Sequence, residues 1–312
     1  MKIVVPDDYP QLLTGTPAEG RLRALGDVTI YTERGANDED ELIRRIAGAG
    51  AVVGLRAYSR FSKRVVDASP SLRMISIWGT GTDNVDLDAC RARGILVTNT
   101  PGVNANSVAE QTIALMLAVA RQIPAMDRGT REGKWPRAML VQLEGKTLGV
   151  LGLGSIGSRV ATIAKAFGMN VIATAWRGDD GRAAAVGAKF VDLDTLLRES
   201  DFVSVHFRLN DETRGILSRD RLALMKPTAF LINTARGAIV DQKALIDALE
   251  TGRIAGAGLD VFHDEPVPAD DKIVTLSNVV LTPHNAGTTA EVIALGLSRT
   301  VENVERFLAH PA

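Results

Sequence analysis

Short runs of apolar residues recur along the chain, and each is followed by a turn or by a segment with helical spacing. The runs are continuous rather than alternating, which is typical of parallel strands that helices cover on both faces. In the first third of the chain we expect strands at Lys2–Val5, Val28–Tyr31, Ala51–Leu55, Met74–Ile77 and Ile95–Thr98. Helical patterns lie between them, at Asp40–Ala47 and Ser62–Ala68 among others.

A second series of apolar runs follows, and it predicts strands at Thr147–Leu151, Asn170–Thr174, Phe202–His206, Ala229–Asn233, Gly258–Val261 and Val279–Leu281. The last helical pattern, Ala290–Leu308, has no strand of its own and is expected to pack back on the first series. We therefore predict an α/β fold with two Rossmann-like, doubly wound parallel-sheet domains, one flavodoxin-like and one dinucleotide-binding. The first domain is discontinuous, with residues 1–100 and 286–312, and residues 101–285 form the second.

The most apolar segment, Ser107–Ala120, is shorter than the ~20 residues that a bilayer requires, so it indicates a buried helix. Ser107 and Glu110 have the spacing of a capping box at its start. At the N-terminus the apolar run Ile3–Val5 ends at Pro6, far too early for a signal-peptide core. We expect a cytoplasmic protein with no membrane partner.

Composition narrows the class of protein further. The chain has 312 residues, too many for one typical core, and its 36 basic residues nearly balance 37 acidic ones. It lacks the basic face that nucleic acid binding needs, so a small molecule is the expected partner. The single cysteine, Cys90, excludes a disulfide framework and a multi-cysteine metal site. No metal is expected, since Asp83 and Asp86 have the spacing of turn residues.

The sharpest motif is Gly152-Leu153-Gly154-Ser155-Ile156-Gly157, which directly follows a predicted strand and opens a helix that runs to about Phe167. In this context Gly152 permits a tight turn, Gly154 lets the backbone approach a pyrophosphate, and Gly157 allows close packing of helix on sheet. The helix N-terminus then offers free N–H groups to the phosphates. The motif predicts a dinucleotide site.

An acidic residue that binds the adenosine ribose usually ends the second strand of such a unit. Here Ala175 takes that position, followed by Trp176 and Arg177. The missing carboxylate beside an arginine favours a 2′-phosphate and hence NADP over NAD. The alternative, that Asp179 or Asp180 serves instead and the cofactor is NAD, stays open.

Three further charged residues, Arg236, Glu265 and His284, follow predicted strands, where open α/β sheets place their sites. Together they fit the reduction of a 2-oxo acid. Arginine offers a planar fork for a substrate carboxylate, and histidine exchanges protons near neutral pH. A glutamate beside the histidine would favour the imidazolium and fix its tautomer.

With these residues the chain resembles the D-isomer-specific 2-hydroxyacid dehydrogenases, and among them it is most similar to phosphoglycerate dehydrogenases. The resemblance covers essentially the whole chain. It rests on ordered motifs that include Gly79-Thr80-Gly81-Thr82-Asp83-Asn84-Val85-Asp86, Asn99-Thr100-Pro101-Gly102, Ser107-Val108-Ala109-Glu110, Gly145-Lys146-Thr147-Leu148-Gly149, the glycine turn, Thr234-Ala235-Arg236-Gly237, Gly258-Leu259-Asp260-Val261-Phe262, Glu265-Pro266 and Pro283-His284.

The resemblance implies that Arg236, Glu265 and His284 are the catalytic set, and that substrate enters a cleft between the two domains. It implies that Arg56 and the backbone of Gly79, Thr80 and Gly81 approach the acidic groups of the substrate, with Arg236 and His284. The residues implied to line the cofactor are Thr80, Ser155, Ile156, Thr234, Ala235, Asp260, His284 and Gly287. Members are commonly homo-oligomers that meet through the dinucleotide domain, so a homodimer is expected.

We therefore predict an oxidoreductase that moves a hydride between NAD(P)H and C2 of a small 2-oxo or 2-hydroxy acid. An alternative is a cofactor-sensing protein like the corepressors that share this fold and its triad. Formate-type enzymes usually pair the histidine with glutamine, where this chain has Glu265, whereas phosphite oxidation shares the triad. Tyr58, Trp135 and Leu140 would set the pocket size. Phosphoglycerate dehydrogenases often carry a regulatory domain after the catalytic core, and because this chain ends near that core we expect none.

Overall fold

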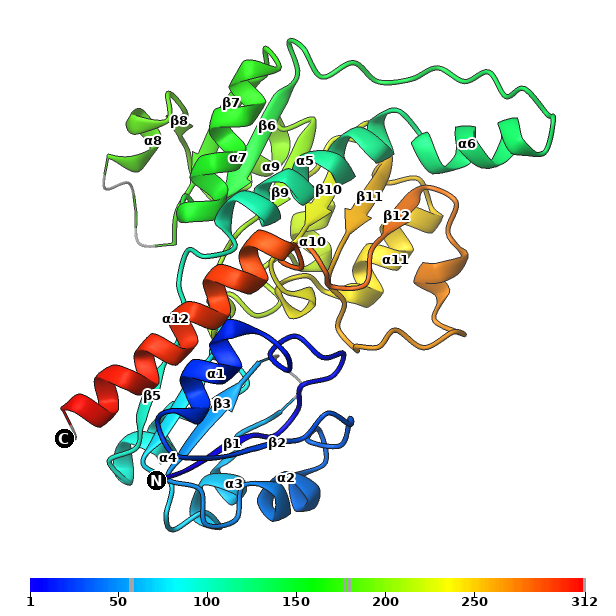
Figure 1. Cartoon of the computed structure of the whole chain (residues 1–312). Coiled ribbons are helices and arrows are strands. Elements are labelled where there is room, and N and C mark those ends of the chain that lie inside the picture. The colour runs from blue at the N-terminus through cyan, green and yellow to red at the C-terminus, as the bar shows by residue number, and fades with distance from the viewer. Residues whose placement is uncertain (56–58, 177, 179–180, 311–312) are drawn as a thin grey trace. The chain divides into compact units, whose positions relative to one another are not determined.

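The computed structural model describes residues 1–55, 59–176, 178 and 181–310, and within them the chain forms two compact units. Unit 1 comprises Met1–Asn104 and Thr288–Ala312, and unit 2 comprises Ala105–Gly287. The expected domain boundaries, after residue 100 and before residue 286, lie a few residues from these. Figure 1 follows the chain from the blue N-terminus through unit 2 and back to the red helix of unit 1.

Unit 1 is built on a parallel sheet of five strands in the order β2-β1-β3-β4-β5. This order is that of flavodoxin-like folds. The strands are β1 Lys2–Val5, β2 Asp27–Ile30, β3 Ala51–Gly54, β4 Met74–Ile77 and β5 Leu96–Thr98. One face packs against α1 Pro17–Arg23 and α12 Ala290–Ala309, and the other against α2 Glu39–Arg45, α3 Lys63–Asp67 and α4 Leu87–Ala92.

The last helix, α12, returns to unit 1 as the sequence predicts. Its Thr300 carbonyl accepts a hydrogen bond from Ser76 Oγ of β4 at 3.1 Å. Gly296 of the same helix lies against Trp78, so that a Cβ atom on Gly296 would stand 1.8 Å from the indole nitrogen. A long helix without a strand partner therefore completes one face of the first sheet.

Unit 2 is built on a parallel sheet of seven strands in the order β12-β11-β10-β9-β6-β7-β8. The strands are β6 Thr147–Leu151, β7 Asn170–Thr174, β8 Lys189–Phe190, β9 Phe202–Val205, β10 Phe230–Asn233, β11 Gly256–Leu259 and β12 Val279–Leu281. The direction of winding changes between β6 and β9, and such a switch point is where open α/β sheets bind ligands.

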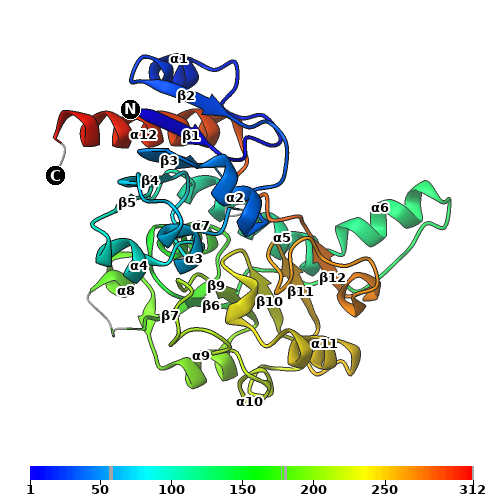
Figure 2. The ribbon, with the colours of Figure 1, turned by 90° about the horizontal axis from the view of Figure 1, so that it is seen from below.

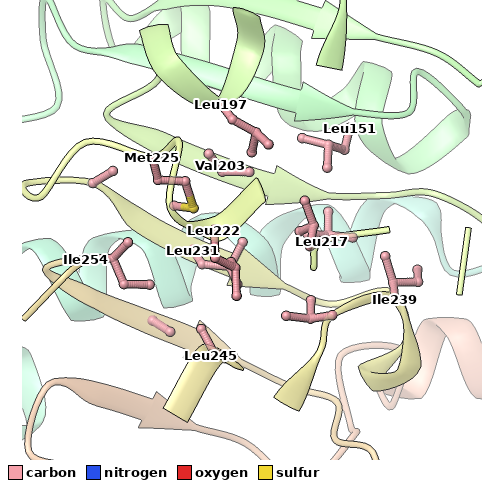
Figure 3. Packing of buried hydrophobic residues seen from close by; sticks show 14 of the residues in the cluster. Leu151, Leu197, Val203, Leu217, Leu222, Met225, Leu231, Ile239, Leu245 and Ile254 are labelled. Atoms are coloured by element: carbon pink, nitrogen blue, oxygen red, sulfur yellow. The ribbon is translucent and has the colours of Figure 1, made fainter. Parts of the chain in front are cut away.

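Helices cover both faces of the second sheet, which is why its central strands are almost continuously apolar. On one face lie α5 Ala105–Ala120 and α7 Ser155–Ala166, and on the other α9 Leu193–Glu199, α10 Arg219–Leu222 and α11 Gln242–Glu250. Figure 3 shows the core on the face covered by α9, α10 and α11. There Leu151, Val203 and Leu231 of neighbouring strands pack with Leu197, Leu222 and Leu245 of the helices. The prediction of two doubly wound parallel-sheet domains is confirmed.

Three local predictions were wrong. β11 begins two residues before the predicted Gly258, because the small residues Gly256 and Ala257 extend the ladder beside β10. The short edge strand β8 was not predicted. The capping box is also wrong, because α5 begins at Ala105 and Ser107 lies inside the helix. Ser107 Oγ instead donates to the Ala286 carbonyl at 2.6 Å, a tertiary contact that no local pattern reveals.

The remaining helices of unit 2 in the described residues are α6 Ile123–Arg131, the four-residue α8 Arg182–Ala185 and two short 3-10 helices, η1 Gly237–Ile239 and η2 Lys272–Thr275. None of the residues of α6, all of which the structure describes, is buried. In Figures 1 and 2, α6 and the chain after it run away from the sheet of unit 2. Among the described residues, no helix is both long and apolar enough to span a membrane.

Candidate active site

The glycine turn after β6 has the backbone that its three glycines predict. Gly152 has a φ of +101° and lies against the His206 carbonyl, and both features exclude a side chain. A Cβ atom on Gly157 would stand 1.9 Å from the Gly152 carbonyl oxygen, so this glycine lets α7 pack on the turn. Around Gly154, by contrast, the space that a Cβ atom would enter is open.

The open side of this turn is the N-terminus of α7. Gly154 caps the helix without a side-chain hydrogen bond, and Gly154 and Ser155 are exposed. No acidic residue lies in the first turn, so the helix dipole there is not neutralised by a local carboxylate. Exposed N–H groups on a backbone that a ligand can approach closely fit the pyrophosphate of a dinucleotide.

The position expected for a ribose-binding acid lies at the carboxyl end of β7. Ala175 follows the last residue of this strand, Thr174, whose carbonyl accepts a hydrogen bond from Gly152 N at 2.9 Å. Next comes Trp176, whose Nε1 donates to Glu212 Oε2 at 2.6 Å. The other sequence candidates here, Arg177, Asp179 and Asp180, lie outside the described residues.

The loop after β10 holds Arg236 in place through its own backbone. The side-chain amide of Asn233 donates to the Arg236 carbonyl at 3.0 Å, and its Oδ1 accepts from Ala235 N at 3.0 Å. Thr234 is buried, and its hydroxyl is 2.8 Å from that of Thr112 in α5. Because these bonds tie the backbone of residues 234–236 to β10 and α5, the half-buried Arg236 side chain starts from a fixed backbone.

Gly237 brings this loop against the loop that follows β11. A Cβ atom on Gly237 would stand 2.0 Å from the carbonyl carbon of Phe262. Phe262 N in turn donates to Glu265 Oε1 at 2.9 Å. The close approach therefore joins the backbone that carries Arg236 to the backbone that positions Glu265.

Glu265 and His284 form a hydrogen-bonded pair, with Glu265 Oε2 at 2.6 Å from His284 Nδ1. Burial pushes the pKa of Glu265 upward, but the hydrogen bond and charge of His284, the Phe262 N–H and the charge of Arg236 outweigh it. The pKa of Glu265 therefore lies below its ordinary value, and the carboxylate is ionised at neutral pH. An ionised carboxylate only accepts hydrogen bonds, so Nδ1 carries the proton of this bond and Nε2 is left for chemistry.

Asp260 anchors the loop that carries His284. Its side chain is inaccessible to solvent, and its Oδ1 accepts from Thr282 Oγ1 at 2.6 Å and from Asn285 N at 3.1 Å. Its Oδ2 accepts from Ala286 N at 3.0 Å. His284 lies inside this span and has a φ of +51°, an uncommon conformation for a residue with a side chain.

His206, which follows β9, is not a second acid. Burial lowers its pKa to about 3, so the ring is neutral at physiological pH. Its Nε2 lies 2.8 Å from Ser204 Oγ, and its carbonyl faces Gly152. His206 thus packs beneath the glycine turn. His263 and His310, by contrast, are exposed.

The substrate candidates of unit 1 lie after β4. Thr100 Oγ1 accepts from Gly79 N at 2.8 Å, and Asn99 donates to the Thr80 carbonyl at 2.7 Å. These bonds hold the turn of Gly79, Thr80 and Gly81, and Gly79 has a φ of +137°. Arg56 and Tyr58 lie outside the described residues.

Unit 2 thus brings together Arg236, Glu265 and His284, which the sequence singled out, with Asp260 and Gly287 on or beside the His284 loop. Three contributors are not apparent from the sequence. They are Gly237 as a contact between loops, Thr112 as the partner of Thr234, and Glu212 as the partner of Trp176. A glycine after a candidate arginine was the one available signal. The other two contacts join segments that only the fold brings together.

Comparison with known proteins gives a family. Residues 113–286 match the model of the D-isomer specific 2-hydroxyacid dehydrogenase, NAD binding domain. A glyoxylate reductase of Korarchaeum cryptofilum is 40% identical over 287 residues, which cover 90% of this chain and 86% of that protein. A D-3-phosphoglycerate dehydrogenase of Archaeoglobus fulgidus is 44% identical over 254 residues, which cover 81% of this chain and 48% of that protein.

This chain spans about half the length of the phosphoglycerate dehydrogenases that it matches. Among solved structures, an acyclic imino acid reductase in complex with NADPH and D-Arg is 32% identical, with a TM-score of 0.89. The alignment covers 99% of this chain and 97% of that one. The chain belongs to the D-isomer specific 2-hydroxyacid dehydrogenase family.

Proposed function

We propose that this chain is a cytoplasmic, NAD(P)-dependent D-2-hydroxyacid dehydrogenase that interconverts a small 2-oxo acid and its 2-hydroxy acid. One observation carries the proposal: His284 Nδ1 lies 2.6 Å from Glu265 Oε2, in loops of the unit that also carries the glycine turn. The charge of Arg236 acts on the same glutamate. A proton donor, its orienting carboxylate and a carboxylate-binding arginine therefore lie in one dinucleotide-binding unit.

The residues of the glycine turn, with Ala175, Thr234 and Ala235 at the ends of neighbouring strands, would hold the dinucleotide. Asp260, which is closed to solvent, would act only through the loop that carries His284. When bound, NAD(P)H supplies a hydride to C2 of the substrate. Arg236 would bind the substrate carboxylate through its two-pronged guanidinium, which also orients the neighbouring carbonyl. Gly79, Thr80, Gly81 and Arg56 of unit 1 belong to the proposed substrate site.

As negative charge develops on the C2 oxygen, His284 gives it the Nε2 proton, so that hydride addition at C2 and protonation of the oxygen together convert the carbonyl group to an alcohol. Glu265 remains ionised and stabilises the imidazolium from the Nδ1 side. In the oxidative direction neutral His284 takes the proton back. The proton of the hydroxyl group thus goes to His284 Nε2, and the hydride leaves C2 for the oxidised dinucleotide.

Similarity to a glyoxylate reductase over most of both chains supports glyoxylate or hydroxypyruvate as substrate. Similarity to phosphoglycerate dehydrogenases, over about half of their length, supports phosphohydroxypyruvate as the competing candidate. The absence of an acid at Ala175 favours NADPH, and the similar imino acid reductase was solved with NADPH. Nothing in the described part of the chain or in the comparisons favours the cofactor-sensing alternative.

The direct test is oxidation of NADH and NADPH by purified protein with glyoxylate, hydroxypyruvate, pyruvate, phenylpyruvate and phosphohydroxypyruvate. Reduction of NAD and NADP with phosphite covers the reaction that shares this triad. We expect turnover with at least one of the 2-oxo acids. Tight dinucleotide binding without turnover of any of them would contradict the proposal.

Two variants test the assigned roles. His284→Ala should bind the dinucleotide normally and lose about 10²- to 10⁴-fold in kcat, the usual contribution of a general acid. Arg236→Ala should chiefly raise KM for the 2-oxo acid, and Arg236→Lys should not restore it because lysine lacks the fork. Unchanged steady-state kinetics in both alanine variants would remove this mechanism.

The exposed apolar residues of unit 2 support a homodimer as part of this proposal. Trp135 is 71% exposed and Met139 is 94% exposed, and both lie just after α6, in which no residue is buried. Large apolar side chains that gather on one exposed segment are typical of protein–protein contacts. Light scattering should give twice the chain mass, and Trp135→Ala with Met139→Ser should lower it.

A further inference from the structure

Two loops border the glycine turn, and one hydrogen bond joins them. β6 lies between β7 and β9 in the sheet, so the loops that follow β7 and β9 flank the turn on opposite sides. Trp176 belongs to the first loop and Glu212 to the second, and the indole Nε1 donates to Glu212 Oε2 at 2.6 Å. β6 lies between the two strands that carry these loops, and neighbouring strands are ~4.8 Å apart, so the bond passes over the carboxyl end of β6.

Trp176 does not belong to the hydrophobic core, since 46% of it is exposed. What holds its ring is a hydrogen bond to a charged group, which is stronger than one between neutral groups. The residue before it, Ala175, takes the position at which dinucleotide-binding units place their ribose-binding acid. The indole therefore lies at the adenosine end of the candidate cofactor site.

Glu212 is presented from a braced turn. Asn210 Oδ1 accepts from the backbone N–H groups of Glu212 and Thr213, at 3.0 and 2.9 Å. Thr213 is buried, and its hydroxyl donates to the Arg208 carbonyl at 2.7 Å. The backbone at Glu212 is thus fixed before any ligand binds, and its carboxylate reaches from the β9 side toward the position that lacks an acid.

We propose that Trp176 and Glu212 form a specificity-determining pair at the adenosine end of the dinucleotide site. The indole supplies an apolar face for the adenine ring, and Glu212 is the positioning residue that holds this face. The Glu212 carboxylate also places a negative charge beside the ribose, and this charge opposes the 2′-phosphate of NADP but not the 2′-hydroxyl of NAD. The inference rests on the proposed function only in assuming that the chain binds a nicotinamide dinucleotide.

The pair departs from the usual arrangement, in which one acid at the end of the second strand binds the ribose hydroxyls. Here the acid comes from the loop after β9, and a tryptophan stands between it and the strand. The sequence also places Arg177 next to Trp176. The Glu212 charge thus opposes the NADP preference that Ala175 favours, and removing this charge should move the choice between NAD and NADP further toward NADP.

Three variants and one control separate the contributions of the indole ring, its hydrogen bond and the Glu212 charge. Trp176→Ala removes the ring, and Trp176→Phe keeps an aromatic face but loses the N–H donor. Glu212→Gln keeps an acceptor for the indole and loses the charge. Glu199→Gln is the matched control, because Glu199 is an exposed glutamate at the end of α9, just before β9 begins and so at the opposite edge of the sheet.

Equilibrium titration of each variant with NADH, NADPH and ADP-ribose, without any 2-oxo acid, measures the effect. We expect Trp176→Ala to raise the Kd of all three ligands by roughly tenfold, in the range of other base–aromatic contacts. Trp176→Phe should raise these Kd values less. Glu212→Gln should lower the Kd for NADPH by about threefold and change the Kd for NADH by no more than about twofold, because only the 2′-phosphate of NADPH is repelled by the charge that is removed.

Unchanged binding in Trp176→Ala would overturn the inference, as would equal shifts of NADH and NADPH in Glu212→Gln. Wild-type protein that binds no dinucleotide would overturn it too. Because the titrations need no turnover, the two proposals fail separately. If dinucleotide binding responds to the variants as expected but the protein reduces no 2-oxo acid, only the proposed function is wrong. If the enzyme is active but these substitutions do not change dinucleotide binding, only the role of Trp176 and Glu212 is wrong.

Discussion

Gly237 lies so close to Phe262 that a Cβ atom on the glycine would stand 2.0 Å from the Phe262 carbonyl carbon and 2.1 Å from its oxygen. Gly237 directly follows Arg236, and Phe262 N–H holds Glu265 Oε1. Two loops that follow neighbouring strands, β10 and β11, are therefore in backbone contact. The separation between Arg236 and Glu265 therefore depends on residue 237 being a glycine, which has no side chain.

Replacing Gly237 by alanine should separate these loops. The obstacle is backbone rather than the end of a flexible side chain, so both loops must shift, at a cost of about 1–3 kcal/mol in unfolding free energy. Misplacement of Arg236 and Glu265 should lower kcat/KM by about 10²-fold while NADH binding persists. Gly20→Ala is the matched control, since Gly20 is in a helix with open space around it and the change should stabilise slightly. Wild-type kinetics in Gly237→Ala would contradict the role given to this contact.

Asp260→Asn should loosen the loop that carries His284. The carboxylate accepts three hydrogen bonds, and an amide in its place turns one acceptor oxygen into an NH₂ group. If that group faces Ala286 N–H, two donors oppose each other in a site closed to solvent, which costs about 1–3 kcal/mol.

We expect a lower melting temperature for Asp260→Asn and a kcat that falls more than the cofactor affinity does. Thermal unfolding and NADH titration measure the two effects on one preparation. A variant that keeps wild-type kcat and melting temperature would show that the three bonds do not hold the loop.

Much of the fold follows from the sequence, because parallel strands covered on both faces form almost continuous apolar runs. β6, with Leu148, Val150 and Leu151, is such a strand, and its bounds are as predicted. Predictions fail where residues are small or contacts are distant. Gly256 and Ala257 carry too little apolar surface to mark the start of β11, and Ser107 bonds the distant Ala286 rather than its own helix.

The site divides in the same way. Arg236, Glu265 and His284 were predictable because each is a reactive residue type placed just after a strand, and strand ends meet at one edge of a parallel sheet. Glu212 was not, since it is an exposed glutamate in a polar loop and only the sheet order brings it to Trp176. Nor does the sequence show that the Asp260 carboxylate accepts hydrogen bonds from a loop more than twenty residues further along the chain.

Cys90 should be inert in the folded protein. It lies in α4 with 1% of its surface exposed, and burial, with a smaller contribution from the Asp86 charge, raises the pKa of its thiol to about 11. The thiolate is the reactive form, so both access and ionisation oppose reaction. Iodoacetamide should label the protein rapidly in denaturant and hardly at all without it. Fast labelling of the native protein, followed by mass spectrometry, would show that α4 opens.

His206 should make stability depend on pH. Its pKa falls from an ordinary 6.5 to about 3 on folding, so the unfolded chain binds a proton that the folded protein refuses. The stabilising contribution of the neutral ring is complete above pH 6.5 and is lost as the pH falls from 6.5 toward 3.

Over that range the unfolding free energy of the wild-type protein should fall more steeply than that of His206→Gln. The difference in slope should be at most ~1.4 kcal/mol per pH unit, the value for one proton. Urea unfolding of both proteins at several pH values measures it. Equal slopes would mean that the ring is solvated enough to be protonated in the fold.

Glu265→Gln should change the pH dependence of catalysis. The folded protein holds the pKa of Glu265 below its ordinary 4.5, so the charge is present throughout the neutral range and favours protonated His284. Glutamine retains the size and an acceptor oxygen but not the charge. The high-pH limb of the rate profile for 2-oxo acid reduction should therefore move to lower pH, and kcat should fall.

The same change tests linkage to stability. Because the folded pKa of Glu265 is depressed, its ionisation stabilises the protein above pH 4.5, and this contribution disappears as the pH falls through the folded pKa. Wild type and Glu265→Gln should thus differ in unfolding free energy at neutral pH and converge in acid. Asp264→Asn is the control, since it removes a neighbouring exposed carboxylate that lies 3.4 Å from His263 Nδ1. If Asp264→Asn moved the rate profile as far as Glu265→Gln, the effect would be one of general surface charge, and the Glu265–His284 bond would not be its cause.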